Sequence, residues 1–253
     1  MYTAFAEIYD ELMADVDYAS WAAFYEEILS AYGIAPGAKV CECACGTGSL
    51  TLPLRQAGYV MTGVDLSQDM LWVASQKARA AGAAIPFICQ DMRSLRLHRP
   101  MDAVLATCDG VNYLLESRDV ERFFRAAWDA LRPGGALVFD VSTPDKLEHA
   151  LGDRTFFEET ERVSYVWQNT YHPKNATVDM SLSFFVREDS GLYRRIDERQ
   201  TQKAHARETL TELLQLCGYK GIRVMGDHRI AEPTPHEQRW HIAALKPMPE
   251  QEG

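Results

Sequence analysis

Three acidic side chains stand where three successive apolar runs of the sequence end. Glu42 lies in the first of these runs, Asp65 directly follows the second, and Asp91 lies two residues after the third. If the runs are neighbouring parallel strands, their carboxyl ends meet at one edge of a sheet, which is where α/β proteins bind ligands. The three carboxylates could then bind one elongated ligand through its cationic amino group, its ribose hydroxyl pair and its adenine amine.

A glycine-rich segment, Ala44-Cys45-Gly46-Thr47-Gly48, follows the first run. Glycine has no Cβ and tolerates positive φ, so such a turn lets a ligand approach the backbone. Asp65 lies about twenty residues beyond Gly46, the separation at which an acid hydrogen-bonds a ribose. Two structural interpretations stay open: the glycines could serve helix–strand packing alone, and Asp65 could only start a helix near Ser67.

A nicotinamide cofactor fits this segment less well. Its fingerprint, G-x-G-x-x-G, needs a third glycine, whereas the sequence from Gly46 reads Gly-Thr-Gly-Ser-Leu-Thr. Glu42 stands before the loop, where it would repel a diphosphate and attract a cationic amino group. The pattern therefore favours S-adenosylmethionine as the ligand.

Six cysteines are scattered along the chain, and three of them, Cys41, Cys43 and Cys45, alternate by two. Side chains at that spacing share one face of a strand and cannot surround a tetrahedral ion by themselves. We predict reduced, packed thiols, with neither a disulfide framework nor a metal site.

The elements that must hold these residues alternate between strands and helices. Apolar runs predict strands at 40–43, 60–64, 85–89, 103–107, 136–141, 222–225 and 240–245, and helical periodicity predicts helices at 20–32, 49–57, 67–81, 119–131 and 207–216. This order indicates an α/β fold with a doubly wound parallel sheet. Strict alternation at 163–167 and 178–184 predicts an antiparallel β-meander inserted late in that domain.

At these residues the chain resembles the class I S-adenosylmethionine-dependent methyltransferases. The segment 42–48 is similar to their first motif, Asp65 to their ribose-binding acid, Asp91-Met92 to their adenine-binding pair, and 131–135 to their turn before the fifth strand. Ala44 departs from the pattern, because many members have glycine there. The small-molecule members, among them enzymes that methylate glycine or amino-sugar nitrogens, are the most similar.

The resemblance implies a Rossmann-like, seven-stranded sheet whose last strand is antiparallel. It implies an N-terminal helical lid at 1–35, a cofactor-binding domain at 36–150 and 203–247, and a β insertion at 151–202 that covers the acceptor. The cofactor-binding residues that it implies are Tyr9, Glu42, Ala44, Cys45, Gly46, Gly48, Asp65, Leu66, Met70, Gln90, Asp91, Met92 and Cys108. An apolar face of the insertion could equally pack on the parent sheet or on a second subunit.

Methyl transfer needs a base only where the attacking atom carries a proton. Asp109 and Tyr113 follow the fourth strand and are the candidate catalytic residues, although Asp109 could instead fix its loop. His205 and His241 have no visible partner in the sequence, and we do not expect either to be the base.

The net charge of −10 argues against a nucleic-acid partner. We expect a small-molecule methyl acceptor, with nitrogen ahead of oxygen, no membrane segment, a cytoplasmic location, and a homodimer as an open possibility. The alternatives are an aminopropyl transferase, a nicotinamide oxidoreductase, a catalytically silent S-adenosylmethionine-binding module, and a methyltransferase acting on RNA or protein.

Overall fold

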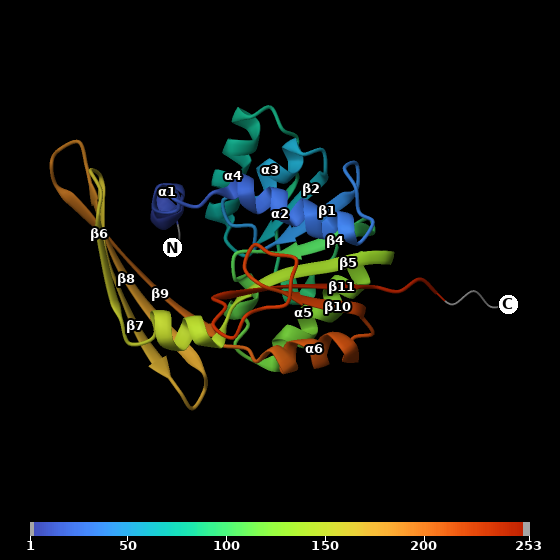
Figure 1. Ribbon diagram of the computed structural model, residues 1–253. Helices are drawn as coiled ribbons and strands as arrows, with labels where there is room; N and C mark the ends of the chain where they lie inside the picture. Colours follow the sequence, from blue (N-terminus) through green and yellow to red (C-terminus); the bar gives the residue numbers. More distant parts are fainter. Residues whose placement is uncertain (1–2, 250–253) are drawn as a thin grey trace.

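The main sheet places the predicted ligand-binding edge at the centre of the molecule. The computed structural model describes residues 3–249 (Figure 1). The strands of this sheet are β1 (Lys39–Cys43), β2 (Val60–Asp65), β3 (Phe87–Cys89), β4 (Met101–Ala106), β5 (Leu131–Ser142), β10 (Lys220–Met225) and β11 (Arg239–Leu245). Their order is β10-β11-β5-β4-β1-β2-β3, and only β11 runs antiparallel to its neighbours. The predicted doubly wound sheet with an antiparallel last strand is confirmed.

Helices cover both faces of this sheet. Helices α2 (Tyr18–Ala31) and α3 (Thr51–Gln56) pack on one face, whereas α5 (Ser117–Ala130) and α6 (Arg207–Leu216) pack on the other. Helix α4 (Gln68–Ala80) packs against β2 and β3, and Ser67 caps it by accepting a hydrogen bond from the backbone N–H of Met70. No helix within residues 3–249 is both long and apolar enough to cross a membrane.

The cysteines of β1 serve packing, as predicted. Cys41 and Cys43 are fully buried in the core beneath α5, while Val40 points to the opposite core beneath α2. Cys45 is buried as well, and all six thiols are free. A small apolar side chain suits a strand whose two faces are both covered.

A second sheet forms the predicted meander. Its strands, in spatial order, are β6 (Thr155–Glu159), β7 (Val163–His172), β8 (Thr177–Arg187) and β9 (Tyr193–Lys203), all antiparallel. Helix α1 (Thr3–Leu12) lies between this sheet and α4, where Phe5 and Ile8 pack on Phe184 (Figure 1). The apolar face of the sheet is therefore used mainly for packing. The domain division at residues 35, 150 and 202 stays a prediction.

Several element boundaries differ from the sequence expectation, and two of these differences have a clear physical cause. The third strand begins at Phe87 and not at Ile85, because Pro86 has no N–H to give to a ladder. The turn expected at Pro133-Gly134-Gly135 is instead part of β5, where it forms an irregularity: Met101 pairs with Leu131, but Ala103 pairs with Ala136.

Candidate functional site

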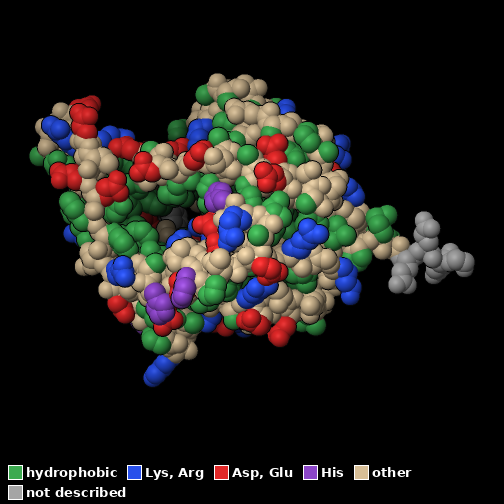
Figure 2. Space-filling view, in the orientation of Figure 1, with side chains coloured by type: hydrophobic (Ala, Val, Ile, Leu, Met, Phe, Trp, Pro, Cys, Tyr) green, Lys and Arg blue, Asp and Glu red, His purple; other side chains and the backbone are tan. Residues whose placement is uncertain are grey.

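A cavity of about 570 Å³ opens at the carboxyl ends of β1, β2 and β4. Helix α1 covers it from one side and β9 borders it from another, and Figure 2 shows the molecule hollowed between the second sheet and the main body. The sequence-predicted residues that line the cavity are Tyr9, Glu42, Ala44, Cys45, Gly46, Asp65, Leu66, Met70, Gln90, Asp91, Met92, Cys108, Asp109 and Tyr113. Its size is typical of pockets that bind cofactors.

Gly48 is the one predicted site residue that does not line this cavity. Its φ is +73°, and a Cβ there would lie 3.2 Å from the Ala74 side chain and 3.4 Å from the Phe87 ring. Gly48 therefore serves the close packing of the loop on α4 and β3. Gly46 has φ +53° and nothing within 4 Å of its would-be Cβ, so its peptide faces open space that a ligand can approach.

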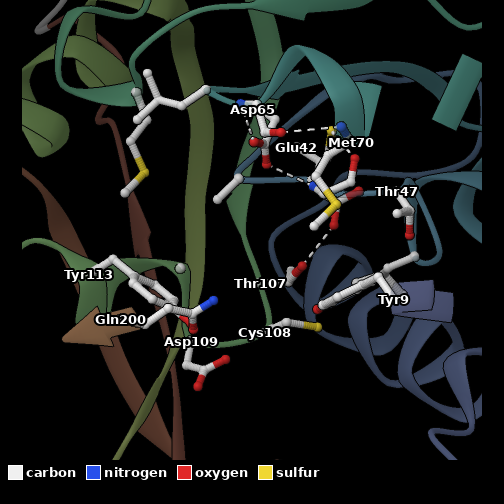
Figure 3. A pocket seen from close by; sticks show the side chains of 18 of the residues that line it. Tyr9, Glu42, Thr47, Asp65, Met70, Thr107, Cys108, Asp109, Tyr113 and Gln200 are labelled. Carbon is white, nitrogen blue, oxygen red and sulfur yellow. Dashed lines mark hydrogen bonds between the residues drawn. The ribbon is translucent and has the colours of Figure 1, made fainter. Parts of the chain in front are cut away.

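Asp65 is held by two backbone amides at the end of β2. The N–H of Gly46 donates to Oδ2 and the N–H of Ser67 donates to Oδ1, each at 2.8 Å. Burial nevertheless raises the pKa of this carboxyl. The two bonds fix the carboxylate in place, while each oxygen keeps a lone pair that can accept from a ribose hydroxyl. Asp65 thus anchors the turn near Ser67 and also faces the cavity, while its binding of a ribose stays a prediction (Figure 3).

Glu42 is buried beneath the loop, at 2% exposure. The hydroxyls of Thr51 and Thr107 donate to its two oxygens, at 2.5 and 2.7 Å. Burial raises the pKa of the Glu42 carboxyl to about 7, although both hydroxyl bonds act against that rise. A cationic ligand group in the cavity would stabilise the ionised form.

Asp91 is paired with an arginine that the sequence analysis did not include. The guanidinium of Arg93 contacts the Asp91 carboxylate at 2.6 Å and the Asp119 carboxylate at 2.9 Å. The side-chain hydrogen bonds from Arg93 lower the pKa of Asp91. Both Asp91 oxygens already accept bonds from Arg93, so the expected bond to an adenine amine has to share them.

Polar contacts fasten α1 over the cavity. Asp10 of this helix accepts from the hydroxyls of Thr47, at 2.5 Å, and Ser49, at 3.1 Å, and it pairs with the Lys77 ammonium at 2.6 Å. Tyr9, the preceding residue, faces the cavity (Figure 3). We call Asp10, Thr47, Ser49 and Lys77 the α1 latch.

The loop after β4 carries two consecutive residues in the left-handed region. Cys108 has φ +53° and Asp109 has φ +56°, a conformation that costs non-glycine residues energy and is common at functional sites. The backbone N–H of Asp109 donates to buried Asp140, at 3.0 Å, which holds the turn. The Tyr113 hydroxyl donates to Gln200 Oε1 of β9 at 2.8 Å, so the loop joins the second sheet at the rim of the cavity.

His205 and His241 lie outside the cavity lining. Burial lowers the pKa of His205 to about 4, so its imidazole is neutral near pH 7. The expectation that neither histidine is the base agrees with this placement.

Comparisons with known proteins bear on this geometry. A family model described as a methyltransferase domain matches residues 40–135. A protein of Geobacillus sp. (strain WCH70) that is named as a methyltransferase is 34% identical over 245 residues, which cover 97% of this chain and 99% of the relative. A solved S-adenosylmethionine-dependent methyltransferase from Clostridium acetobutylicum ATCC 824 is 30% identical, with a TM-score of 0.86 and 97% and 99% of the two chains covered. The chain belongs to the S-adenosylmethionine-dependent methyltransferases.

The cofactor of the methyltransferase is S-adenosylmethionine, and the cavity suits it. Asp65 offers fixed acceptors, Glu42 offers a carboxylate for a cationic group, and the Gly46 peptide faces open space. The sugar N-methyltransferase KedS8 from Streptoalloteichus sp. ATCC 53650 shares the fold, with a TM-score of 0.74 at 22% identity and 91% and 88% coverage. The family assignment favours methyl transfer over the nicotinamide alternative.

Several cavity residues of the methyltransferase escaped the sequence analysis. They are Phe5, Tyr18, Thr47, Ser49, Leu50, Ser67, Arg93, Thr107, Gly110, Leu114, Arg199, Gln200 and Thr201. Thr107 directly follows β4, and Asp65 ends β2, so the strand-end rule could have found Thr107. Residues 199–201 arrive from the second sheet, and no local pattern in the sequence points to them.

Proposed function

We propose that the methyltransferase transfers a methyl group to a nitrogen atom of a small-molecule amine. The supporting observation is the charge of the cavity. Among the described residues its walls carry four carboxylates, Glu42, Asp65, Asp91 and Asp109, against the guanidinium groups of Arg93 and Arg199. Arg93 and Asp91 pair with each other, which leaves Glu42, Asp65 and Asp109 against Arg199. A cationic amine is attracted to such a wall, and an anionic acceptor is repelled.

Tyr113 is the residue that we assign to the acceptor. Tyr113 is 44% exposed, and its hydroxyl donates a hydrogen bond to Gln200 Oε1. A phenolic oxygen accepts as well as donates hydrogen bonds, and Tyr113 lines the cavity, where an acceptor N–H can approach it. Figure 3 shows Tyr113 and Gln200 side by side on the cavity wall across from Tyr9.

Asp109 is better suited to holding the loop than to removing a proton. Its Oδ2 accepts from Gln202 Nε2, at 2.9 Å, and from Ser142 Oγ, at 3.3 Å. In Figure 3 its carboxylate points away from Asp65 and Glu42. We therefore propose the structural one of the two roles that the sequence left open for Asp109.

Bound S-adenosylmethionine supplies a methyl group activated by its positively charged sulfur. The chain has to hold the acceptor nitrogen in line with that methyl and exclude water. Phe5 and Tyr9 of α1 and Met70 of α4 are the apolar part of the wall that excludes water. An ammonium must lose one proton to bulk water before its nitrogen can attack, and we assign to the Tyr113 oxygen the hydrogen bond from a remaining N–H.

The kinship with sugar and glycopeptide N-methyltransferases of the same fold supports a nitrogen acceptor. The net charge of −10 supports a partner other than nucleic acid. A homodimer and a cytoplasmic location stay predictions.

The first experiment is calorimetric titration of the protein and of Asp65→Asn with S-adenosylmethionine, S-adenosylhomocysteine and NADH. We expect binding of the first two ligands, about 100-fold weaker in the variant because charge-assisted ribose hydrogen bonds are lost, and no binding of NADH. Equal affinity of the variant for S-adenosylmethionine would show that Asp65 does not bind the cofactor.

The acceptor is then sought with radiolabelled cofactor among amino sugars, amino acids and matched hydroxyl compounds. Transfer to amines that falls about 10-fold in Tyr113→Phe supports the proposal, because one hydrogen bond in the transition state is lost. Transfer to hydroxyl compounds alone would contradict the nitrogen assignment.

A further inference from the structure

Three potential metal ligands meet at the turn between β10 and β11, outside the cofactor cavity. They are the Asp227 carboxylate and the imidazoles of His228 and His241, and their nearest ligand atoms all lie within 4.8 Å of one another. Asp227 Oδ1 is 3.5 Å from His241 Nε2 and 3.8 Å from His228 Nε2. None of the three residues lines the cavity.

The hydrogen bonds of His241 indicate which of its nitrogens carries the proton. Tyr25 donates its hydroxyl proton to Asp140 Oδ1 at 3.0 Å, and the same Tyr25 oxygen lies 3.2 Å from His241 Nδ1. Since Tyr25 has only one proton, Nδ1–H is the donor of the second bond. Nε2 of His241 then presents a lone pair toward Asp227.

Both facing atoms are buried and lack a conventional partner. His241 is fully buried, and neither its Nε2 nor Asp227 Oδ1 has a hydrogen-bond partner among residues 3–249. Two acceptors that face each other away from water are unfavourable unless a cation lies between them. The geometry points to such a cation.

The neighbouring charged groups leave the negative charge of Asp227 available to a cation. The guanidinium of Arg239 contacts the fully buried carboxylate of Asp140, so Arg239 is neutralised there and the charge of Asp227 remains. Glu237 accepts a bond from the backbone N–H of Asp227, at 3.0 Å, and pairs with Arg229, which fixes the loop that carries Asp227 and His228. The site is thus held in place before any ion binds.

We propose that Asp227, His228 and His241 bind one divalent transition-metal ion of the Zn²⁺ type. Ligands at about 2.0–2.1 Å from a tetrahedral zinc lie roughly 3.4 Å apart, close to the two separations between Asp227 and the histidines. The rings of Trp21 and Phe24 pack against both imidazoles and give the site an apolar shell. The Tyr25–Asp140 pair is the outer support that orients His241.

The ion would fasten the loop 226–238 to β11, a structural role separate from methyl transfer. The sequence analysis predicts no metal site because Asp227-His228 and His241 belong to different elements. Their spacing matches no common zinc motif. Only the pairing of β10 with β11, which sets Met225 opposite His241, brings them together.

The test uses the full chain prepared without a histidine tag and stripped with a chelator. Equilibrium dialysis with Zn²⁺ alone and titration with Co²⁺, followed by its visible absorption, should show one ion per chain. His228→Ala should weaken binding at least ~100-fold, because it removes a direct ligand and even outer-support mutations cost 10–100-fold. His228 is exposed, so this variant should fold.

His236→Ala is the matched control, since His236 is an exposed histidine of the same loop and should leave binding unchanged. Asp227→Asn provides a second ligand variant of the same size. The proposal is overturned by the absence of saturable binding, by equal binding in His228→Ala, or by nitrogen NMR showing both His241 nitrogens protonated at pH 7. That last result would mean an imidazolium–carboxylate pair. S-adenosylmethionine binding by His228→Ala should remain normal, which separates this test from that of the cofactor site.

Discussion

Glu42 is proposed to bind a cationic group as a carboxylate, yet its burial disfavours the ionised form. Its pKa is about 7 in the folded protein because of burial, against an ordinary value of 4.5. The folded state therefore binds more protons than the unfolded state between these values. Stability from this group is fully present below pH 4.5 and is lost as the pH rises through 7. The unliganded enzyme thus gives up stability to keep a carboxylate ready for a cation.

Glu42→Gln should reverse that loss. Without cofactor, we expect the variant to be more stable than the natural protein by up to about 3 kcal/mol at pH 8, and to gain much less at pH 5, because glutamine never ionises. Urea unfolding at the two pH values measures the difference. A gain that does not change with pH would show that the Glu42 carboxyl titrates normally. The same variant should bind S-adenosylmethionine more weakly, which calorimetry at pH 8 checks.

Helix α1 covers the cavity through a few polar contacts and a modest apolar patch. Asp10 supplies the contacts to Thr47, Ser49 and Lys77, and Phe5 and Ile8 supply the patch. Because such a helix lies at the low-stability end of a fold, it can open without global unfolding. A cofactor that has to enter a covered cavity requires this property.

Asp10→Ala should release α1. We expect faster hydrogen exchange of residues 3–12 and about 10-fold weaker cofactor binding, with little change in global unfolding. Glu11→Ala is the control, because Glu11 pairs with Arg162 at the surface and leaves the α1 latch intact. Equal exchange rates in the two variants would mean that the apolar patch alone holds the helix.

The sequence predicted the secondary-structure elements better than it predicted the contacts between them. The strands of the main sheet, the β-meander and the strand-end acids follow from local patterns, since apolar runs and turn residues are set within a few positions. The α1 latch joins Asp10 to Lys77, and Gln200 meets Tyr113 only because two sheets are placed side by side. Such contacts depend on tertiary structure, so composition and spacing could not predict them.

At the scale of the whole molecule, Asn112 joins the two sheets. Its amide N–H groups donate to the carbonyls of Ser142, at the end of β5, and Lys203, at the end of β9, and its Oδ1 accepts from the Ser142 N–H at 2.9 Å. The residue is fully buried. One side chain therefore fixes the strand that carries Gln200 relative to the loop that carries Tyr113.

Asn112→Ala should destabilise the protein by about 3 kcal/mol, because three buried backbone groups lose their partner. It should also lower methyl transfer more than cofactor binding, since it displaces Tyr113 and Gln200 but not Asp65. Urea unfolding and calorimetry measure the two effects. Asn175→Ala, at an exposed turn of the meander, is the control. A loss of stability as small as in that control would contradict the joining role.

The antiparallel last strand has a consequence for folding during synthesis on the ribosome. β5 pairs with β4 on one edge and with β11 on the other, yet the second sheet and α6 are translated between β5 and β11. At 5–20 residues per second, the roughly one hundred intervening residues take about 5–20 s to synthesise. During that interval a strongly apolar strand edge stays open to any neighbouring nascent chain. Translational pauses before Arg239 should therefore lower the yield of soluble enzyme without changing the stability of the finished protein.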